Sequence, residues 1–302
     1  MLLACKIKLP SNFRHNDILN FHRRDPQMLA ERVDHDVIYK GIIWNRHPAC
    51  LTIRFESRHV HAALDVDDLH EECDTRDLEC LTCGMLGLNQ PIEVFENRFK
   101  DHAQFGRLIA INPGLRVPLA ATPFEAVTWA ITGQQISIAV AISIRRRLIQ
   151  TVGIRHSGGL WCYPDAFHLA NVPVVDMRNA GFSKMKANTL SVLSRQVMAG
   201  LLFNPTKGSL SHEEVRKRLI EISGIGTWTV DYTLLRGFGF LDGSLHGDAA
   251  LRRNLKSLLA SREPVSASEA KNWLQEFSPW RGMVAAHLWA MSAALDPLTT
   301  GG

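Results

Sequence analysis

The sequence predicts a mainly α-helical protein with a smaller α+β unit at its N-terminus. From about residue 95 onward, apolar residues recur at helical spacing behind capping residues such as Thr122 and Ser211. Earlier in the chain, two runs rich in β-branched residues, 37–44 and 51–55, flank a turn and are typical of paired strands. No internal repeat or low-complexity segment points to another architecture.

Residues 1–97 are expected to form the separate α+β unit. Besides the two strands, the stretches 16–21 and 26–32 suggest short helices. The acidic segment 65–79 is expected to face solvent. Nothing in this unit points to catalysis, so its expected role is to support the helical part.

The helical part is expected to begin with a helix over 95–107, followed by a loop at 112–118 with a proline near each end. A strong helix start lies at 122–125, with a threonine cap, proline at the first helical position and glutamate in the first turn. The segment 133–137 interrupts this helix. The arginine triplet 145–147 on the resumed helix predicts a solvated basic face, with contact to DNA as the less favoured alternative.

A helix–hairpin–helix pattern lies further along the chain. Ser211 and Glu214 have the spacing of a capping box and start a helix, which Gly224 is expected to stop by entering the left-handed region. Gly226 lets the backbone approach an external group, and residues 228–235 restart a helix. The turn amides and the new helix N-terminus would make a natural seat for a phosphate. On glycine spacing alone, an ordinary αα-hairpin fits equally well.

Asp248 stands directly before the next apolar stripe, which consists of Ala249, Leu251, Leu255, Leu258 and Leu259. It is therefore expected to be a helix N-cap, and the helix dipole favours a carboxylate at that position. A cap also holds a carboxylate rigidly, which suits a catalytic group. Asp231, within the second hairpin helix, and Asp242, in a loop, are weaker candidates.

The last helix is expected to begin near Trp280. At about 100° per residue, Trp289 points away from Trp280, on a face of small residues. Such a tryptophan is available to line a ligand site or, nearly as well, to pack against another domain.

Length and charge limit the functional classes. A chain of 302 residues suggests two or three compact units, and no apolar run is long enough to span a membrane. Residues 1–100 hold 13 Lys and Arg against 16 Asp and Glu, whereas residues 101–302 hold 21 against 14. The half with the hairpin is thus the basic half, as phosphate binding requires, although a solvated face would look the same. We expect a cytoplasmic protein.

Three of the six cysteines, Cys73, Cys80 and Cys83, have a spacing that some iron–sulfur proteins use. A fourth ligand is missing, because Asn89 occupies the expected position, and the triplet precedes the hairpin. We therefore expect reduced thiols and no metal.

The motif Gly224-Ile225-Gly226-x-Trp228-Thr229 followed by Asp248 resembles the helix–hairpin–helix/Gly-Pro-Asp DNA glycosylases. Within that superfamily it is most similar to the 3-methyladenine DNA glycosylases II. Further segments match in order: 113–118, 133–137, 279–281 and 287–289. The likeness covers nearly the whole chain and is strongest from Asn112 onward.

The resemblance implies three domains. Residues 1–97 would form a small antiparallel-sheet domain similar to one repeat of the TATA-binding protein. Residues 98–122 and 241–302 would form the helical domain on the side of the catalytic aspartate, and residues 123–240 the helical domain with the hairpin.

The resemblance also assigns residues. Asp248 would be catalytic, and Trp228, Tyr232 and Trp289 would line the pocket for a flipped base. The DNA contacts would come from two segments: Gly224, Ile225, Gly226 and Thr227 in the hairpin, and Gln134, Gln135 and Ile136 in the interrupting loop. Gln135 would fill the space left by the extruded nucleotide, where some members carry leucine. A plain helix connector is the alternative for that loop.

The implied reaction is hydrolysis of the N-glycosidic bond of alkylated purines in double-stranded DNA, such as 3-methyladenine and 7-methylguanine. Stacking on electron-rich rings would hold a cationic base, and the Asp248 carboxylate would stabilise the oxocarbenium-like sugar. No cofactor is needed, although the hairpin would hold a phosphate through a monovalent cation. We expect a monomer.

Two positions refine this interpretation. Bifunctional relatives place a Schiff-base lysine at the position of Trp228, so the sequence predicts a monofunctional enzyme without lyase activity. Ala249 replaces a residue that is often aromatic, which leaves the substrate range open. The alternatives are a glycosylase for 8-oxoguanine or uracil and a non-catalytic hairpin protein that binds DNA.

Overall fold

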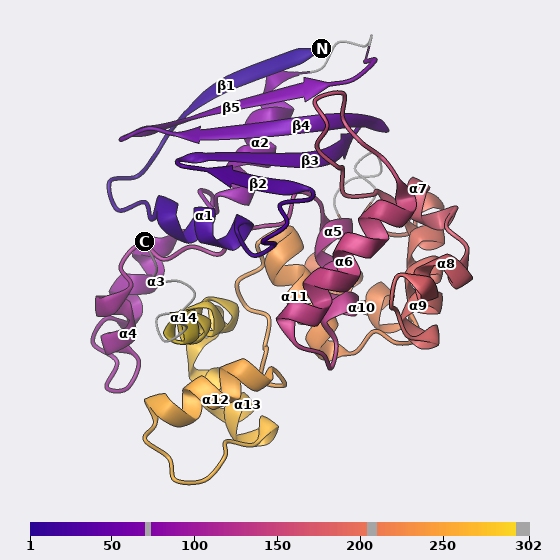
Figure 1. Ribbon diagram of the computed structural model, residues 1–302. Helices are drawn as coiled ribbons and strands as arrows, with labels where there is room; N and C mark the ends of the chain where they lie inside the picture. The colour runs from indigo at the N-terminus through magenta and orange to yellow at the C-terminus, as the bar shows by residue number, and fades with distance from the viewer. Residues whose placement is uncertain (70–73, 204–209, 294–302) are drawn as a thin grey trace.

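The computed structural model describes residues 1–69, 74–203 and 210–293, and it is mainly helical with one five-stranded antiparallel sheet (Figure 1). The predicted fold class is confirmed. In the described ranges, no helix combines the length and the apolar character that crossing a bilayer requires.

The N-terminal unit is a sheet with helices against it. Its elements are β1 (Leu2–Lys8), α1 (His15–His22), β2 (Glu31–Asp34), β3 (Val37–Trp44), β4 (His47–Phe55), β5 (His59–Val66) and α2 (Thr75–Met85). The strand order is β1-β5-β4-β3-β2, and α2 crosses one face of the sheet (Figure 1). Inward-facing residues alternate along β4 and β5 and form one buried cluster with α1 and α2.

Two local predictions in this unit need correction. The stretch 26–32 is not a helix. Its end is the start of β2, where Glu31 pairs with Lys40 of β3, and pairing with a neighbouring strand overrides local helical preference. The strands β1 and β5 were not predicted, because the alternation of β1 is weak and β5 is rich in histidine and alanine.

The remaining elements are helical. They are α3 (Ile92–Phe99), α4 (Gly106–Ile111), α5 (Pro123–Gly133), α6 (Ile138–Val152), α7 (Ala166–Ala170), α8 (Val174–Asn179), α9 (Lys184–Met198), α10 (His212–Ile220), α11 (Thr227–Phe238), α12 (Ala249–Leu258), α13 (Ala267–Leu274) and α14 (Arg281–Ala293). The single helix predicted over 95–107 is wrong, because the chain turns between α3 and α4. The His102 Nδ1 atom accepts the Phe105 amide at 3.0 Å and stabilises this turn.

The helices pack in two hydrophobic clusters that meet along α5 and α11. On α11, Tyr232 and Leu235 belong to the cluster with α3, α4, α12 and α14, whereas Val230 and Leu234 belong to the cluster with α6 and α9. The pair α5 and α11 is thus the seam of the helical part. The domain limits given above stay a prediction.

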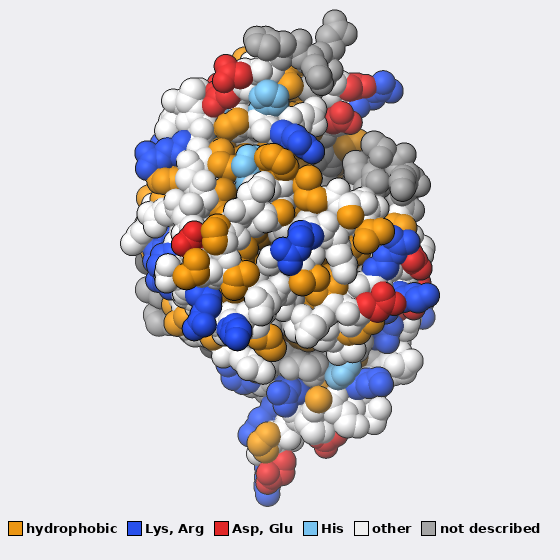
Figure 2. Space-filling view, turned by 90° about the vertical axis from the view of Figure 1, so that its right-hand side faces the viewer, with side chains coloured by type: hydrophobic (Ala, Val, Ile, Leu, Met, Phe, Trp, Pro, Cys, Tyr) orange, Lys and Arg blue, Asp and Glu red, His pale blue; other side chains and the backbone are white. Residues whose placement is uncertain are grey.

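On the face shown in Figure 2, over helices α7 to α9, Lys and Arg side chains are spread among polar and hydrophobic ones. These helices expose the apolar residues Phe167, Val175 and Met185. This face is therefore mixed rather than dominated by one kind of side chain.

Only one member of the arginine triplet, Arg147, is exposed as predicted. Arg145 is held between Glu31 of β2 and Glu125 of α5, with Nη2–Oε1 distances of 2.8 and 2.7 Å. Arg146 pairs with Asp25 at 3.2 Å, and Arg147 donates to the Ala180 carbonyl at 2.7 Å. The solvated face is therefore wrong for Arg145 and Arg146, whose ion pairs join the helical part to the N-terminal unit.

A buried histidine gives the fold a specific acid sensitivity. His287 of α14 is fully buried beside Phe95 and Phe105, and burial lowers its pKa to about 4. An unfolded histidine binds its proton near pH 6.5, so the folded state loses stability as pH falls from 6.5 toward 4. We expect this group to cost about 3 kcal/mol across that interval.

The replacement His287→Leu should remove this loss of stability at low pH. Chemical denaturation of wild type and variant at pH 7, 5.5 and 4.5 measures it. The expected result is a flatter pH dependence for the variant above pH 4.5. Parallel curves would show that His287 does not cause the sensitivity.

Candidate functional site

Asp248 is the N-cap of α12, as predicted. Its Oδ1 accepts the Leu251 amide at 2.8 Å, which fixes the side chain at the helix start. Two indole groups also donate to it: Trp289 Nε1 to Oδ1 and Trp228 Nε1 to Oδ2, both at 3.1 Å. Residues from α11, α12 and α14 therefore converge on one half-buried carboxylate, which accepts hydrogen bonds from three neutral N–H donors.

The predicted pocket residues form one ring cluster. Tyr232 lies between the two tryptophans, with ring centroids 5.3 Å from Trp228 and 6.3 Å from Trp289. Trp228 and Tyr232 share a face of α11 because they are four residues apart. The structure thus brings together all four residues predicted for chemistry and base binding, from segments 20 to 41 residues apart.

The hairpin has the predicted geometry. Gly224 has φ +91°, and a Cβ there would lie 2.3 Å from Thr189 Oγ1, so both conformation and space require glycine. Gly226 is the exposed N-cap of α11, which has no side-chain cap. Its first amides thus point outward without a capping oxygen, as an anion site requires. Ile225 is buried, whereas Thr227 is exposed.

The interrupting loop is attached to the hairpin by Gln134. Its Nε2 donates to the Gly224 carbonyl and to Thr229 Oγ1, both at 2.9 Å. Lys186, which is buried, donates to the carbonyls of Thr132 (2.9 Å) and Gln134 (2.7 Å), and burial lowers the pKa of its ammonium group. These contacts fix the interrupting loop to the hairpin and to α9.

Gln135 is presented at the tip of this loop. It is exposed, with φ +57°, a left-handed conformation that non-glycine residues seldom adopt. Ile136 packs partly against the neighbouring hydrophobic cluster. Of the three loop residues predicted to contact DNA, Gln135 is therefore the one whose side chain is free to extend outward.

Replacement by alanine should therefore affect stability at Gln134 and DNA binding at Gln135. Gln134→Ala removes two internal hydrogen bonds and should lower the free energy of unfolding by about 1–3 kcal/mol. Gln135→Ala should change stability by less than about 0.5 kcal/mol and weaken only the binding of duplex DNA. Thermal unfolding and duplex titration of both variants measure this. Equal stability of the two variants would contradict the attachment described above.

The two weaker carboxylate candidates have structural partners. Asp231 forms an ion pair with Arg216, and burial is the largest influence on its pKa, which is raised. Asp242 accepts both Nε and Nη2 of Arg281 at 2.8 Å. Neither of them is among the groups that contact Trp228 or Trp289, so Asp248 is the carboxylate of the ring cluster.

Sequence reasoning missed part of this cluster. Phe21 and Arg24, at the end of α1, reach it from the N-terminal unit, and Arg236 reaches it from α11. The Arg236 guanidinium carbon lies 5.6 Å from the Trp289 ring centroid and 5.0 Å from that of Phe21. The position of Arg236, four residues after Tyr232, was a usable signal. The approach of α1 depends on tertiary packing alone.

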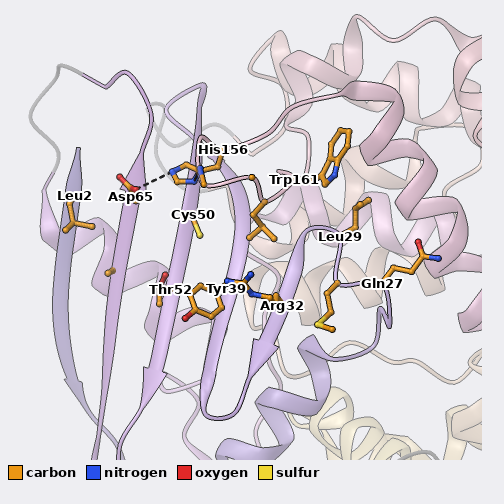
Figure 3. Close-up of a pocket in the computed structure, with 15 residues that line it drawn as sticks. Leu2, Gln27, Leu29, Arg32, Tyr39, Cys50, Thr52, Asp65, His156 and Trp161 are labelled. Atoms are coloured by element: carbon orange, nitrogen blue, oxygen red, sulfur yellow. Dashed lines mark hydrogen bonds and ion pairs between the residues drawn. The ribbon is translucent and has the colours of Figure 1, made fainter.

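A cavity of about 580 Å³ lies elsewhere, between the sheet and the loop 156–161 (Figure 3). Arg32, Tyr39 and Trp161 line it, together with His156, whose Nε2 lies 3.5 Å from Asp65 Oδ2. None of the residues predicted for the site is in its lining, so we do not place the function there. Cys80 and Cys83 lie on α2 as free thiols, and Cys73 lies outside the described residues.

Comparison with known proteins defines the class. A family model described as "HhH-GPD superfamily base excision DNA repair protein" matches residues 128–279, half of the chain. This match covers the interrupting loop, the hairpin, Trp228, Tyr232 and Asp248, and it ends before Trp289. The chain belongs to the HhH-GPD superfamily of base excision DNA repair proteins. The resemblance predicted from the motif is confirmed at this level.

Individual relatives are more distant. DNA-3-methyladenine glycosylase 2 of Escherichia coli (strain K12) is 28% identical over 186 residues, 61% of this chain and 63% of that protein, which is less than two thirds of its length. Among solved structures, a 3-methyladenine DNA glycosylase from Archaeoglobus fulgidus has a TM-score of 0.79 at 18% identity, covering 97% of this chain and 99% of that one. A Clostridium acetobutylicum 8-oxoguanine glycosylase/lyase in complex with DNA has a TM-score of 0.74 at 13% identity, covering 98% of each chain. These two structures share the fold of this chain.

Proposed function

We propose that this protein is a monofunctional DNA glycosylase that removes alkylated purines from double-stranded DNA by hydrolysis of the N-glycosidic bond. The observation that carries the proposal is the Asp248 carboxylate, fixed at the start of α12 and bonded by the indoles of Trp228 and Trp289. In a protein of this superfamily, such a carboxylate beside clustered aromatic rings suits a sugar that becomes positively charged as its base departs.

The arrangement suggests how substrate would bind. The uncapped N-terminus of α11 would hold a backbone phosphate, with a monovalent cation as a further partner, and Gln135 would enter the duplex where the nucleotide has left. The base would then lie against Trp228, Tyr232 and Trp289. The sugar would face Asp248, which would stabilise the oxocarbenium-like centre and guide a water molecule to it. We expect a monomer acting on DNA in the cytoplasm.

The test is base release from methylated duplex DNA, with the products separated by chromatography. The expected products are 7-methylguanine and 3-methyladenine, with the DNA strand left intact until alkali is added. Strand cleavage without alkali, together with trapping by borohydride, would show lyase chemistry and contradict the monofunctional assignment.

A second candidate is a glycosylase for another damaged base, which the structural likeness to an 8-oxoguanine glycosylase/lyase favours. Trp228 stands where bifunctional relatives carry lysine, which argues against the lyase part of that activity. Release of 8-oxoguanine or uracil in the same assay, without release of methylated purines, would establish this candidate instead.

A further inference from the structure

Two arginines from distant parts of the chain meet beside the ring cluster. Arg24, just after α1, has its guanidinium carbon 3.8 Å from the Phe21 ring centroid and 5.6 Å from that of Trp129. Arg236 lies 5.0 Å from the same Phe21 centroid and 5.6 Å from Trp289. The Phe21 ring is therefore shared by two guanidinium groups, one from each part of the fold.

Among the described residues, neither of these guanidinium groups forms an ion pair with a carboxylate. Within residues 1–69, 74–203 and 210–293, their hydrogen bonds go to backbone carbonyls. Arg24 Nε donates to the Phe21 carbonyl at 2.8 Å, and Arg236 Nη1 donates to the Pro118 carbonyl at 2.9 Å. The phenol of Tyr232 lies near both groups and favours their charged forms. Arg236 Nε is buried and has no acceptor among the described residues. The guanidinium group of Arg236 therefore retains an N–H donor without an acceptor among the described residues.

Both groups stay charged at neutral pH. Burial lowers the pKa of Arg236 to about 10, which is still well above 7, and the Arg24 side chain is exposed to solvent. The neighbouring ion network of Glu31, Lys40, Glu125 and Arg145 balances its own charges. The ring cluster therefore combines one carboxylate, Asp248, with two guanidinium groups.

The position of Arg236 along α11 shows what it can reach. Trp228, Tyr232 and Arg236 are spaced four residues apart on one helix face, so each lies about 6 Å further from the hairpin than the last. Trp228 contacts Asp248 at the near end. A sugar at Asp248 would place the far edge of a purine toward Arg236, whereas a phosphate at the hairpin would lie at the opposite end of α11.

We propose that Arg24 and Arg236 donate hydrogen bonds to an exocyclic oxygen of the flipped base, and that the site thereby prefers purines with a C6 carbonyl. This inference rests on the proposed function and narrows its substrate class. 7-Methylguanine and hypoxanthine present such an acceptor. 3-Methyladenine presents an amino group there, so it meets the guanidinium donors with further donors and no acceptor. Both methylated purines carry a positive charge in DNA, so repulsion applies to both, and the group at C6 is what separates them.

The test compares bases within one preparation. Full-length wild type and the variant Arg24→Gln act on methylated duplex DNA, and the ratio of 7-methylguanine to 3-methyladenine released is measured. Release of hypoxanthine from a defined duplex is measured alongside. Arg24 is exposed, so its replacement should leave the fold intact, which circular dichroism checks. Arg23→Gln is the matched control, because this adjacent exposed arginine donates to Asn20 and the His35 carbonyl.

In the Arg24→Gln variant, we expect the 7-methylguanine to 3-methyladenine ratio to fall at least about tenfold and hypoxanthine release to fall about 10- to 100-fold. Arg23→Gln should match wild type, and Arg24→Lys should recover part of the ratio. An unchanged ratio, or equal loss for all three bases, overturns the inference and leaves the glycosylase assignment intact. Release of no base at all by wild type overturns both.

Discussion

The variant Asp248→Asn is expected to lose about 10²- to 10⁴-fold in the rate of base release while still binding duplex DNA. The reason is the loss of negative charge where the sugar becomes positive. Asparagine is as good an N-cap as aspartate, so the bond to the Leu251 amide should persist. The amide NH₂ would face the Trp228 donor, which costs one hydrogen bond, or about 1 kcal/mol of stability. Single-turnover release and thermal unfolding separate the two effects.

Asp165→Asn serves as the matched control for this variant. Asp165 is also an N-cap carboxylate, which accepts the His168 amide at 2.9 Å at the start of α7, and it is not part of the ring cluster. Its replacement should leave base release unchanged. If Asp248→Asn retains most of the wild-type rate, the protein is a DNA-binding member of the superfamily whose carboxylate has only a structural role.

The variant Lys40→Met is expected to lower the free energy of unfolding by about 3–5 kcal/mol. Lys40 Nζ lies 2.6 Å from Glu31 Oε1 and 2.7 Å from Glu125 Oε1, and only 2% of its side chain is exposed. Its removal leaves two buried carboxylates that share the Arg145 guanidinium, with His22 Nδ1 2.9 Å from Glu31 Oε2 as a further partner. Urea denaturation at neutral pH measures the loss.

Lowering the pH should reduce the difference in free energy of unfolding between Lys40→Met and wild type. Lys40 and Arg145 lower the pKa of both Glu31 and Glu125 against the opposing effect of burial. In wild type, the resulting stability is present above the unfolded value of about 4.5 and is lost as pH falls below it. In the variant, protonation relieves an uncompensated charge, so its stability should approach that of wild type between pH 7 and 4.

The double variant Lys40→Met with Glu125→Gln provides the control. It removes one charge of each sign, and the glutamine can still accept the Ala121 amide that Glu125 Oε2 accepts at 3.1 Å. We expect it to recover part of the stability that the single variant loses. A single variant as stable as wild type would show that the network contributes little and that burial in this region is incomplete.

The same network has a functional consequence. It joins β2 and β3 to α5 and α6, and so fixes the N-terminal unit against the helical seam. Phe21 and Arg24 belong to that unit yet reach the ring cluster on the helical side. The N-terminal unit therefore contributes side chains next to the ring cluster in addition to packing against the helical part, which the sequence alone did not suggest.

Predictions were reliable where the residues of one short segment suffice to determine its conformation. Thr122 and Ser211 cap α5 and α10, Asp248 caps α12, and Gly224 takes the left-handed conformation. One detail at α10 differs, because the Glu214 side chain pairs with Arg218 and does not return to Ser211. The spacing of a capping box predicts the helix start well, but the second bond depends on competing partners.

Predictions failed where long-range partners decide the outcome. Residues 26–32 were predicted to be helical but lead into the edge strand β2. Arg145 was predicted to face solvent but pairs with Glu125 in a buried ion network. Gln134 was assigned to DNA from its motif, but its amide is bonded to Gly224 and Thr229. Its DNA contact stays a prediction, and its internal role is what the structure adds.

By itself, the sequence determined the helical architecture, the hairpin, the capping aspartate and the family, because each depends on residues within a few turns of one another. Only the tertiary structure decided which groups share the Asp248 carboxylate and which arginines stand beside its rings. Those groups come from α1, α11, α12 and α14, and no local pattern specifies how such distant segments pack.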